Sequence, residues 1–144
     1  CIRDREKTET EDFHIGLKKT LDLHNQKYYP KFKKECDEYF YLKHRKEPRG
    51  IGGIFFDYLN NDNFEKDLNL IKDVGQFFAN FIISNTNSKK DLTYDSDDLK
   101  RLSHKRSRYV EFNLLHDRGT LFGLKTGGNI DAILMSMPPE ARWE

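Results

Sequence analysis

Apolar side chains recur every three or four positions in four stretches of the chain, a spacing that places them on one face of a helix. Pro30 suits the first turn of the second stretch, because its missing N–H has no intrahelical acceptor there. Asp62 or Asn63 can cap the third stretch. A polar loop is predicted at 84–95. The predicted helices are 13 to about 23, 30 to at most 44, 63 to about 85, and 96 to about 105.

Two other stretches have the composition of β-strands. Residues 51–59 form a run too short for a typical helix and rich in β-formers, which predicts a buried strand, bent or closely approached at Gly52-Gly53. Apolar and polar positions alternate in 109–115, Asp117-Arg118-Gly119 interrupts them with turn residues, and 121–124 resumes the pattern. The alternation predicts an antiparallel hairpin that carries an acid and a base at its tip.

A glycine turn, Gly127-Gly128-Asn129, opens the last apolar segment, which ends at Pro138-Pro139. Its spacing suits a helix capped by Asn129 and also suits a strand, so both alternatives stay open. In a helix, the glycine backbone would offer N–H donors to a carboxylate. The whole order of helices, strand and hairpin predicts an α+β fold, an antiparallel β-sheet flanked by α-helices.

Composition sets limits on the size of the protein and on its partners. The 144 residues suffice for one domain at most, and 1–12, dominated by charged residues, is predicted to be a mobile approach to it. A net charge of +1 with 34% charged residues argues against a nucleic-acid partner. No apolar run approaches the roughly 20 residues of a transmembrane segment. The two cysteines predict free thiols.

Two blocks of sequence carry a resemblance. The first is 109–144, in which YVEFNL, DRGT-FGL, a glycine turn and ILMS-P-RWE follow one another. The second contains Tyr29-Pro30, Phe32-Lys33, CDEYF at 36–40, His44-Arg45 and RGIGGIFFD at 49–57. Both blocks closely resemble, in the same order, oxygen-dependent coproporphyrinogen III oxidases. The resemblance extends over 13–144 and is weak over 60–107.

This resemblance implies an enzyme of haem biosynthesis that uses O2 to decarboxylate oxidatively two propionates of coproporphyrinogen III to vinyl groups, giving protoporphyrinogen IX. It also implies a homodimer with a broad antiparallel sheet. Residues 13–144 would be part of the family's domain, roughly its second half or a chain with segments omitted, and 109–144 would supply the substrate turn and the dimerisation segment. Family members are cytoplasmic in bacteria and mitochondrial in eukaryotes, which leaves the compartment open.

The family's usual proton donor, a histidine, precedes the first matching block and has no counterpart in the printed sequence. We therefore expect this chain to supply part of the pocket and the dimer surface, and to be inactive by itself. The alternative is a non-catalytic fragment that dimerises or binds a tetrapyrrole.

The resemblance places functional residues at Asp117 and Arg118. Asp117 would accept hydrogen bonds from pyrrole N–H groups or take one of their protons as oxidation begins, and Arg118 would pair with a propionate. Substrate contact is also implied for Gly127, Gly128 and Asn129. Most family members have Arg where this chain has Asn129, so one expected cation is missing. Without the resemblance, both segments are ordinary turns.

The remaining candidates lie earlier in the chain. Arg45 and Arg49 are expected to receive substrate carboxylates, with Asp57 near the same pocket, and a solvated basic turn is the alternative. His14 and His44 lie in blocks proposed as divalent-metal ligands in some family members, but their separation has no metal-binding spacing, so a supporting or packing role is the alternative. No cofactor beyond O2 is required, and a divalent metal stays open.

Overall fold

The computed structural model describes residues 7–143. These residues form two compact units. Unit 1 holds 7–39 and 51–93, and unit 2 holds 40–50 and 94–143. No helix among residues 7–143 has both the length and the apolar character needed to cross a membrane.

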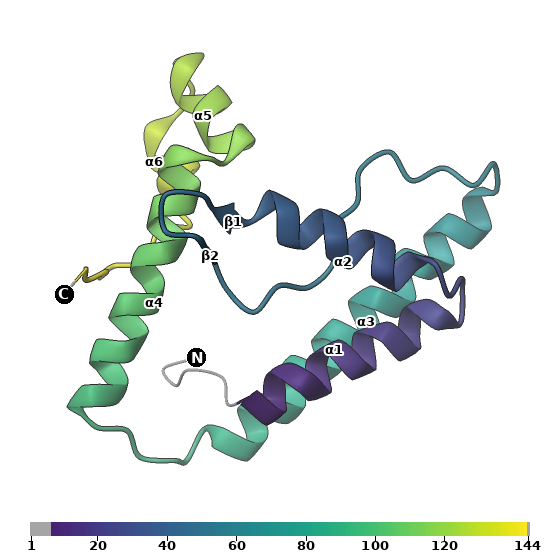
Figure 1. Cartoon of the computed structure of the whole chain (residues 1–144), viewed down its shortest axis with the longest axis horizontal. Helices are drawn as coiled ribbons and strands as arrows, with labels where there is room; N and C mark the ends of the chain where they lie inside the picture. Colours follow the sequence, from purple (N-terminus) through teal and green to yellow (C-terminus); the bar gives the residue numbers. More distant parts are fainter. Residues whose placement is uncertain (1–6, 144) are drawn as a thin grey trace. The chain divides into compact units, whose positions relative to one another are not determined.

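Three helices build unit 1, and their apolar faces meet in one core. The helices are α1 (Lys7–Asp22), α2 (Tyr28–Tyr39) and α3 (Phe64–Lys89) (Figure 1). The buried core cluster consists of Phe13, Leu17, Leu21, Phe32 and Leu70. Its α1 members are four residues apart, which aligns them on one helix face. A Cβ at Gly16 would overlap the Phe77 ring, so the close approach of α1 to α3 requires a glycine there.

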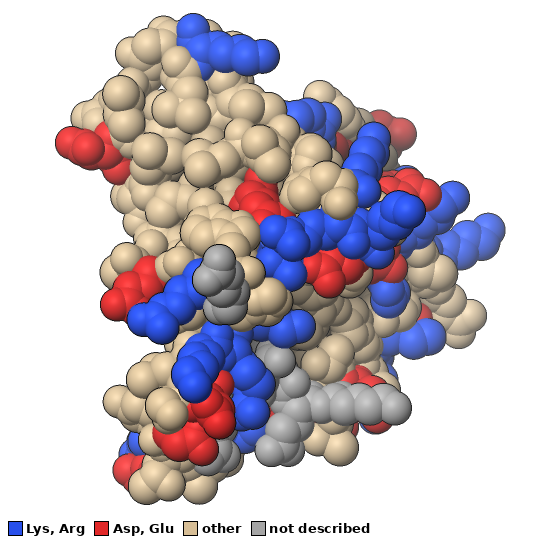
Figure 2. Space-filling view, turned by 60° about the vertical axis from the view of Figure 1, so that its left-hand side comes forward, with Lys and Arg blue, Asp and Glu red and all other residues tan. Residues whose placement is uncertain are grey.

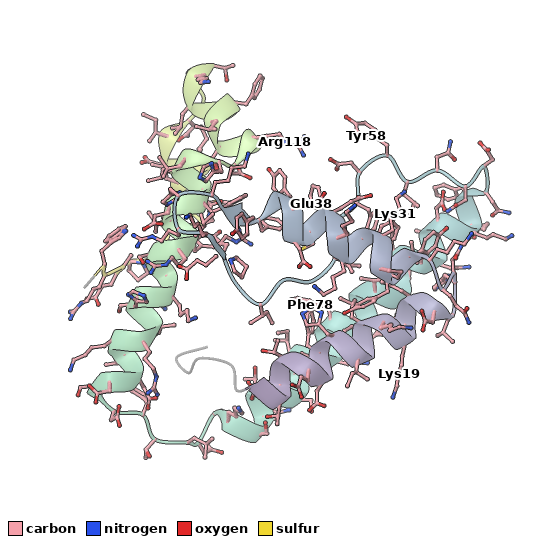
Figure 3. All side chains as sticks on the ribbon, in the orientation of Figure 1. Lys19, Lys31, Glu38, Tyr58, Phe78 and Arg118 are labelled. Atoms are coloured by element: carbon pink, nitrogen blue, oxygen red, sulfur yellow. The ribbon has the colours of Figure 1, made fainter. Side chains whose placement is uncertain are left out.

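Residues 51–59 do not form the predicted strand. Gly52 and Tyr58 have φ values of 76° and 55°, which break an extended conformation. The Tyr58 side chain is fully exposed and points away from the ribbon (Figure 3). Phe56 instead packs on Phe32, with ring centroids 4.5 Å apart, and the Phe55 N–H donates to the Phe32 carbonyl at 3.1 Å. The apolar residues of this loop therefore cover the helical core one by one, without a partner strand.

Unit 2 combines helices with a very small sheet. Strands β1 (Tyr41–Leu42) and β2 (Glu47–Pro48) pair antiparallel, with Tyr41 opposite Pro48. The helices are α4 (Ser96–Leu115), α5 (Arg118–Lys125) and α6 (Ile130–Leu134) (Figure 1). The α+β assignment thus holds only coarsely. Among residues 7–143, helices dominate and the sheet has two strands, whereas the family resemblance implied a broad one.

The hairpin predicted over 109–124 is wrong, because this stretch is helical on both sides of the predicted turn. Helix α4 continues to Leu115, and α5 begins at Arg118. The buried face of α4 includes Ser103, Ser107 and Glu111, spaced four residues apart. A polar buried face gives no signal in a pattern of apolar residues, so the predicted helix ended at about 105 and the alternation in 109–115 was taken for a strand.

Several helix boundaries also differ from the predictions. Residues 1–6 of the expected mobile segment lie outside the described residues, whereas 7–12 belong to α1, where Glu9 pairs with Lys89 of α3. Helix α3 continues beyond the predicted end at 85, into the predicted polar loop. Its N-cap is Asn63, as one alternative predicted, and its side chain accepts from the Lys66 N–H at 3.0 Å.

Candidate functional site

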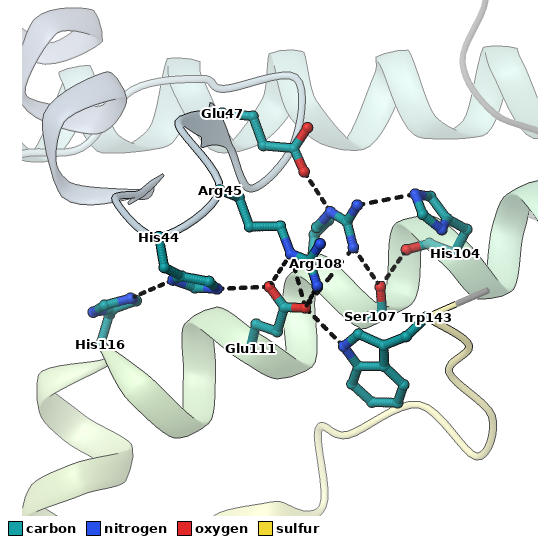
Figure 4. Close-up of polar contacts among 9 residues, drawn as sticks. All are labelled: His44, Arg45, Glu47, His104, Ser107, Arg108, Glu111, His116 and Trp143. Carbon is teal, nitrogen blue, oxygen red and sulfur yellow. Dashed lines mark hydrogen bonds and ion pairs between the residues drawn. The ribbon is translucent and has the colours of Figure 1, made fainter.

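A buried carboxylate, Glu111, is the centre of a polar cluster in unit 2 (Figure 4). The turn between β1 and β2 contributes Arg45, whose Nε donates to Glu111 Oε1 and Oε2 at 3.0 and 2.8 Å and whose Nη2 donates to Oε1 at 2.5 Å. His44 Nε2 lies 2.8 Å from Oε2. The indole N–H of Trp143 donates to Oε1 at 2.7 Å. One carboxylate therefore joins α4 to the segment between β1 and β2 and to the C-terminal segment.

A buried guanidinium, that of Arg108, extends this cluster along α4. Arg108 pairs with Glu47 of β2, and its Nη1 donates to Ser107 Oγ at 3.0 Å and lies 3.8 Å from Glu111 Oε1. Its Nη2 lies 3.0 Å from His104 Nε2. Because a guanidinium only donates, His104 Nε2 must be the acceptor. The ring proton of a neutral His104 is therefore on Nδ1.

The environment of Glu111 keeps its carboxyl ionised. The Arg45 hydrogen bonds are the largest cause that lowers the pKa of Glu111 from 4.5 to about 2, and the His44 and Trp143 hydrogen bonds add to it, while burial opposes them. The same contact raises the pKa of Arg45. A carboxyl with so low a pKa is a poor proton donor or acceptor near neutral pH. Glu111 is therefore suited to hold its partners in place and to neutralise their charge.

Two of the predicted substrate residues lie at the corner between α4 and α5. Asp117 is the N-cap of α5, and its Oδ2 accepts from the Thr120 N–H at 2.7 Å. Arg118 is the first residue of α5 and is exposed, with its side chain directed outward from the helix (Figure 3). Asp117 and Arg118 are therefore adjacent at the start of a helix and not at the tip of a hairpin. The positive end of the helix dipole favours an anionic ligand at this place.

The glycine turn connects α5 to α6. Gly127 has a φ of 72°, which favours glycine. The Gly128 N–H donates to the Gly123 carbonyl at 3.0 Å, so this donor is already used within the turn. Asn129 caps α6 and accepts from the Ala132 N–H at 3.2 Å. The helical alternative for this segment, with Asn129 as its cap, is confirmed.

The predicted basic cluster divides between two kinds of contact. Arg45 is bound to Glu111 as described above. Arg49 places its guanidinium carbon 4.3 Å from the ring centre of Phe40, 5.0 Å from that of Phe112 and 5.1 Å from that of Tyr109. Cation–π contacts of this kind hold an arginine against an aromatic surface. Arg49 is therefore packed among rings and is not part of a solvated basic turn.

Two further predicted residues, Asp57 and His14, belong to unit 1. Asp57 is exposed on the loop after α2. His14 lies between two protein groups, with Nε2 2.8 Å from the Ile51 carbonyl and Nδ1 3.1 Å from the Tyr29 hydroxyl. A carbonyl only accepts, so His14 Nε2 carries a proton. His14 belongs to unit 1 and His44 to unit 2.

No group of three or more His, Cys, Asp or Glu side chains in the described part of the chain is arranged to hold a metal ion. The two ring nitrogens of His14 and the Nε2 of His44 already contact protein groups. These residues do not fit a preformed metal site, and a role for a divalent metal stays an untested prediction.

Residues that the sequence argument did not select are central to the polar cluster: Glu111, Arg108, His104, His116 and Trp143. The first three share one signal, because they recur with Ser107 at three- and four-residue steps. That spacing is typical of a polar helix face. Trp143 gave no such signal, since it reaches Glu111 from 32 residues away in sequence.

Comparison with known proteins shows which family this chain resembles over its length. The coproporphyrinogen III oxidase family profile matches residues 5–144. The oxygen-dependent coproporphyrinogen-III oxidase of Rickettsia rickettsii (strain Sheila Smith) is 55% identical over 138 residues, which are 96% of this chain and 50% of that relative. The proteins of the same name from Rickettsia akari (strain Hartford) and Rickettsia bellii (strain OSU 85-389) are 54% identical over the same shares. The chain thus spans about half the length of these relatives.

Proposed function

From the fact that the chain belongs to the coproporphyrinogen III oxidase family, we propose that it takes part in the oxygen-dependent conversion of coproporphyrinogen III to protoporphyrinogen IX in haem biosynthesis. The observation that carries this proposal is the 55% identity over 96% of the chain with a relative named for that activity. For each propionate, the side chain loses CO2 and two electrons to become a vinyl group. One O2 takes up these electrons with two protons and becomes hydrogen peroxide.

Within unit 2, we assign substrate contacts to the α4–α5 corner and to the glycine turn. The exposed guanidinium of Arg118 pairs with a propionate in a bidentate geometry, supported by the N-terminal dipole of α5. The carboxylate of Asp117 accepts from pyrrole N–H groups. Gly127 and Asn129, both in the glycine turn, contact propionates of the same substrate. Arg45 neutralises Glu111, so its contribution is to shape the site and not to bind a carboxylate.

We also propose a homodimer through the C-terminal helices. None of the residues of α5 and α6 is buried, and Phe122, Ile130 and Met135 are exposed by 70, 61 and 83%. This α5–α6 region, at the top of Figure 2, shows few charged side chains. Apolar side chains exposed together in this way are typical of an interaction surface. Sedimentation equilibrium of the chain tests the dimer.

The activity test uses two proteins: this chain, and a Rickettsia rickettsii relative in which this chain replaces the 138 matching residues. Substrate binding, oxygen uptake and porphyrin fluorescence after re-oxidation are measured under air. We expect binding by both proteins and turnover by the hybrid. Arg118→Ala should weaken binding in both, whereas Lys125→Ala, which removes an exposed cation from the other end of α5, should not. A folded hybrid without turnover would contradict the proposed activity.

A second candidate function is non-catalytic. A chain that forms one wall of a pocket can bind a tetrapyrrole or dimerise without catalysing its oxidation. Binding by this chain without turnover, together with turnover by the hybrid, would favour that non-catalytic role for the isolated chain. Turnover by the isolated chain would exclude it.

A further inference from the structure

The corner between α4 and α5 sets the direction of α5, in addition to the contacts of α5 with α4 and α6. Helix α5 has eight residues, none of them buried, and so short a helix is marginal without tertiary support. Its orientation, and with it the position of Arg118, therefore depends in part on how residues 116 and 117 are fixed. If this corner moved, the acid and the base would move with it.

The backbone of the corner is tied to one buried residue of α4. The N–H groups of His116 and Asp117 both donate to the carbonyl of Phe112, at 2.8 and 3.0 Å, and Phe112 is fully buried. His116 itself has left the helical conformation, with φ −132° and ψ −22°. These bonds fix where α4 ends, but backbone rotation after His116 can still redirect α5.

A row of contacting side chains provides a second link between the corner and α4. His116 Nε2 lies 3.3 Å from His44 Nδ1, and the two rings stack with centroids 5.5 Å apart. His44 Nε2 in turn lies 2.8 Å from Glu111 Oε2 (Figure 4). An ionised carboxylate only accepts, so His44 Nε2 carries a proton. In neutral His44, Nδ1 is then the acceptor and His116 Nε2 the donor. The hydrogen bonds therefore run in one direction, from His116 to His44 and from His44 to Glu111.

Glu111, the last residue of this row of side chains, is held in a fixed position. Three hydrogen-bonding contacts from Arg45 and one from Trp143 hold its carboxylate, and it belongs to the buried face of α4. His116 therefore connects the exposed corner, through His44, to a carboxylate whose position is already fixed. The link crosses 72 residues of sequence between His44 and His116.

We propose that His116, His44 and Glu111 form a positioning chain that fixes the α4–α5 corner and thereby holds Asp117 and Arg118 in the orientation that receives the substrate. None of the three needs to touch the substrate for this role. The proposal rests on the proposed function, in which Asp117 and Arg118 contact coproporphyrinogen III.

The first test measures the corner itself by amide hydrogen exchange in the present chain. The Thr120 N–H, which donates to the Asp117 side chain, and the Leu121 N–H, which donates to the Asp117 carbonyl, report on the start of α5. His116→Ala should raise their exchange rates about tenfold. His116→Gln, which can keep an N–H donor near the position of Nε2, should restore most of the protection. The matched control is His24→Ala, which removes a histidine bonded to Asp73 in unit 1 and should leave both rates unchanged.

A double-mutant cycle tests whether the residues act as one chain. His44→Ala alone should raise the same two exchange rates about as much as His116→Ala, and the double variant should add little. Unchanged exchange in His116→Ala, or fully additive effects of the two substitutions, would overturn the positioning chain. Far-UV circular dichroism of each variant establishes that α4 is intact.

The second test connects the corner to substrate. The dissociation constant for coproporphyrinogen III should rise about tenfold in His116→Ala and return close to that of the unsubstituted chain in His116→Gln. If exchange increases while this affinity does not change, the chain holds the corner but does not position a substrate site, and the proposal fails. If the unsubstituted chain binds no coproporphyrinogen III, the substrate contacts of the proposed function fail, and with them the substrate half of this proposal, while the exchange rates still decide whether the corner is held.

Discussion

The two units of this protein are stabilised in contrasting ways. Unit 1 contains most of the buried apolar side chains found among residues 7–143, from Phe13 to Leu70. In unit 2 the buried apolar residues are Leu42 and Phe112. The buried polar and charged residues in the described part of the chain all lie in unit 2: Ser103, Ser107, Arg108, Glu111 and Asn113.

This difference has a physical meaning for function. Burial of apolar surface is non-directional and tolerates changes in shape if volume is conserved. Hydrogen bonds and ion pairs impose distances and angles, so a buried polar cluster fixes particular side chains. Unit 2 also contains Asp117, Arg118 and the glycine turn. Unit 2, which contains these motif residues, is therefore the unit in which buried hydrogen bonds and ion pairs fix the orientation of particular side chains.

The largest expected effect comes from removing an apolar side chain of unit 1. Phe32 is 1% exposed and packs against the rings of Tyr28 and Phe56, so Phe32→Ala should lower the free energy of unfolding by about 3–5 kcal/mol. Urea denaturation measures this change. Phe78→Ala is the matched control, because Phe78 is 52% exposed (Figure 3) and its loss should cost less than about 1 kcal/mol. Equal losses in the two variants would show that unit 1 is not held by this core.

The corresponding test in unit 2 is Glu111→Gln. The amide keeps the size of the side chain but not its charge, and it leaves Arg45 without its buried carboxylate partner. We expect a loss of about 1–3 kcal/mol in the free energy of unfolding, measured by urea denaturation. Glu38→Gln is the control. Glu38 lies on α2, 3.7 Å from Lys34 in an exposed pair, and its loss should be close to zero. A Glu111→Gln variant as stable as the parent would contradict a polar basis for unit 2.

The same carboxylate predicts how stability depends on pH. The pKa of Glu111 is about 2 in the folded protein and 4.5 ordinarily, so the unfolded chain binds the proton more readily. Its stabilising contribution is complete above pH 4.5 and is lost as the pH falls towards 2. The difference in unfolding free energy between the parent and Glu111→Gln should shrink over this interval, as acid titration followed by circular dichroism would show. A constant difference would mean that Glu111 is not the titrating group.

The smallest expected effect concerns the cation missing from the glycine turn. Asn129→Arg removes the N-cap of α6, at a cost of about 1 kcal/mol to that helix, and introduces the guanidinium that the family resemblance implied at this position. We expect coproporphyrinogen III to bind about twofold to fivefold more tightly, since exposed ion pairs are weak. Isothermal titration measures the affinity. Asn129→Ala, which loses the cap without gaining a charge, should not tighten binding, and equal affinities in the two variants would remove the glycine turn from the proposed site.

Local features of the sequence determined the helices of unit 1 and several caps. Apolar residues at three- and four-residue steps predicted α1, α2 and α3 because a helix places such residues on one face. Asn63 was one of two candidate caps, and Asn129 was the cap in the helical alternative, because an asparagine amide oxygen can reach a backbone N–H group within three residues, as observed for both. The two sequence blocks also identified the family, which the comparison confirms over residues 5–144.

The tertiary structure alone decided the arrangement of unit 2. The end of α4 looked like a strand because its buried face is polar, and it became a helix through partners such as Arg45, 66 residues away from Glu111 in sequence. Residues 51–59 have the composition of a strand, but they pack on the core of unit 1 without a strand partner. Helical periodicity and capping act within a few residues and can be recognised in a sequence. Ion pairs and core contacts join distant residues, so they exist only once the chain has folded.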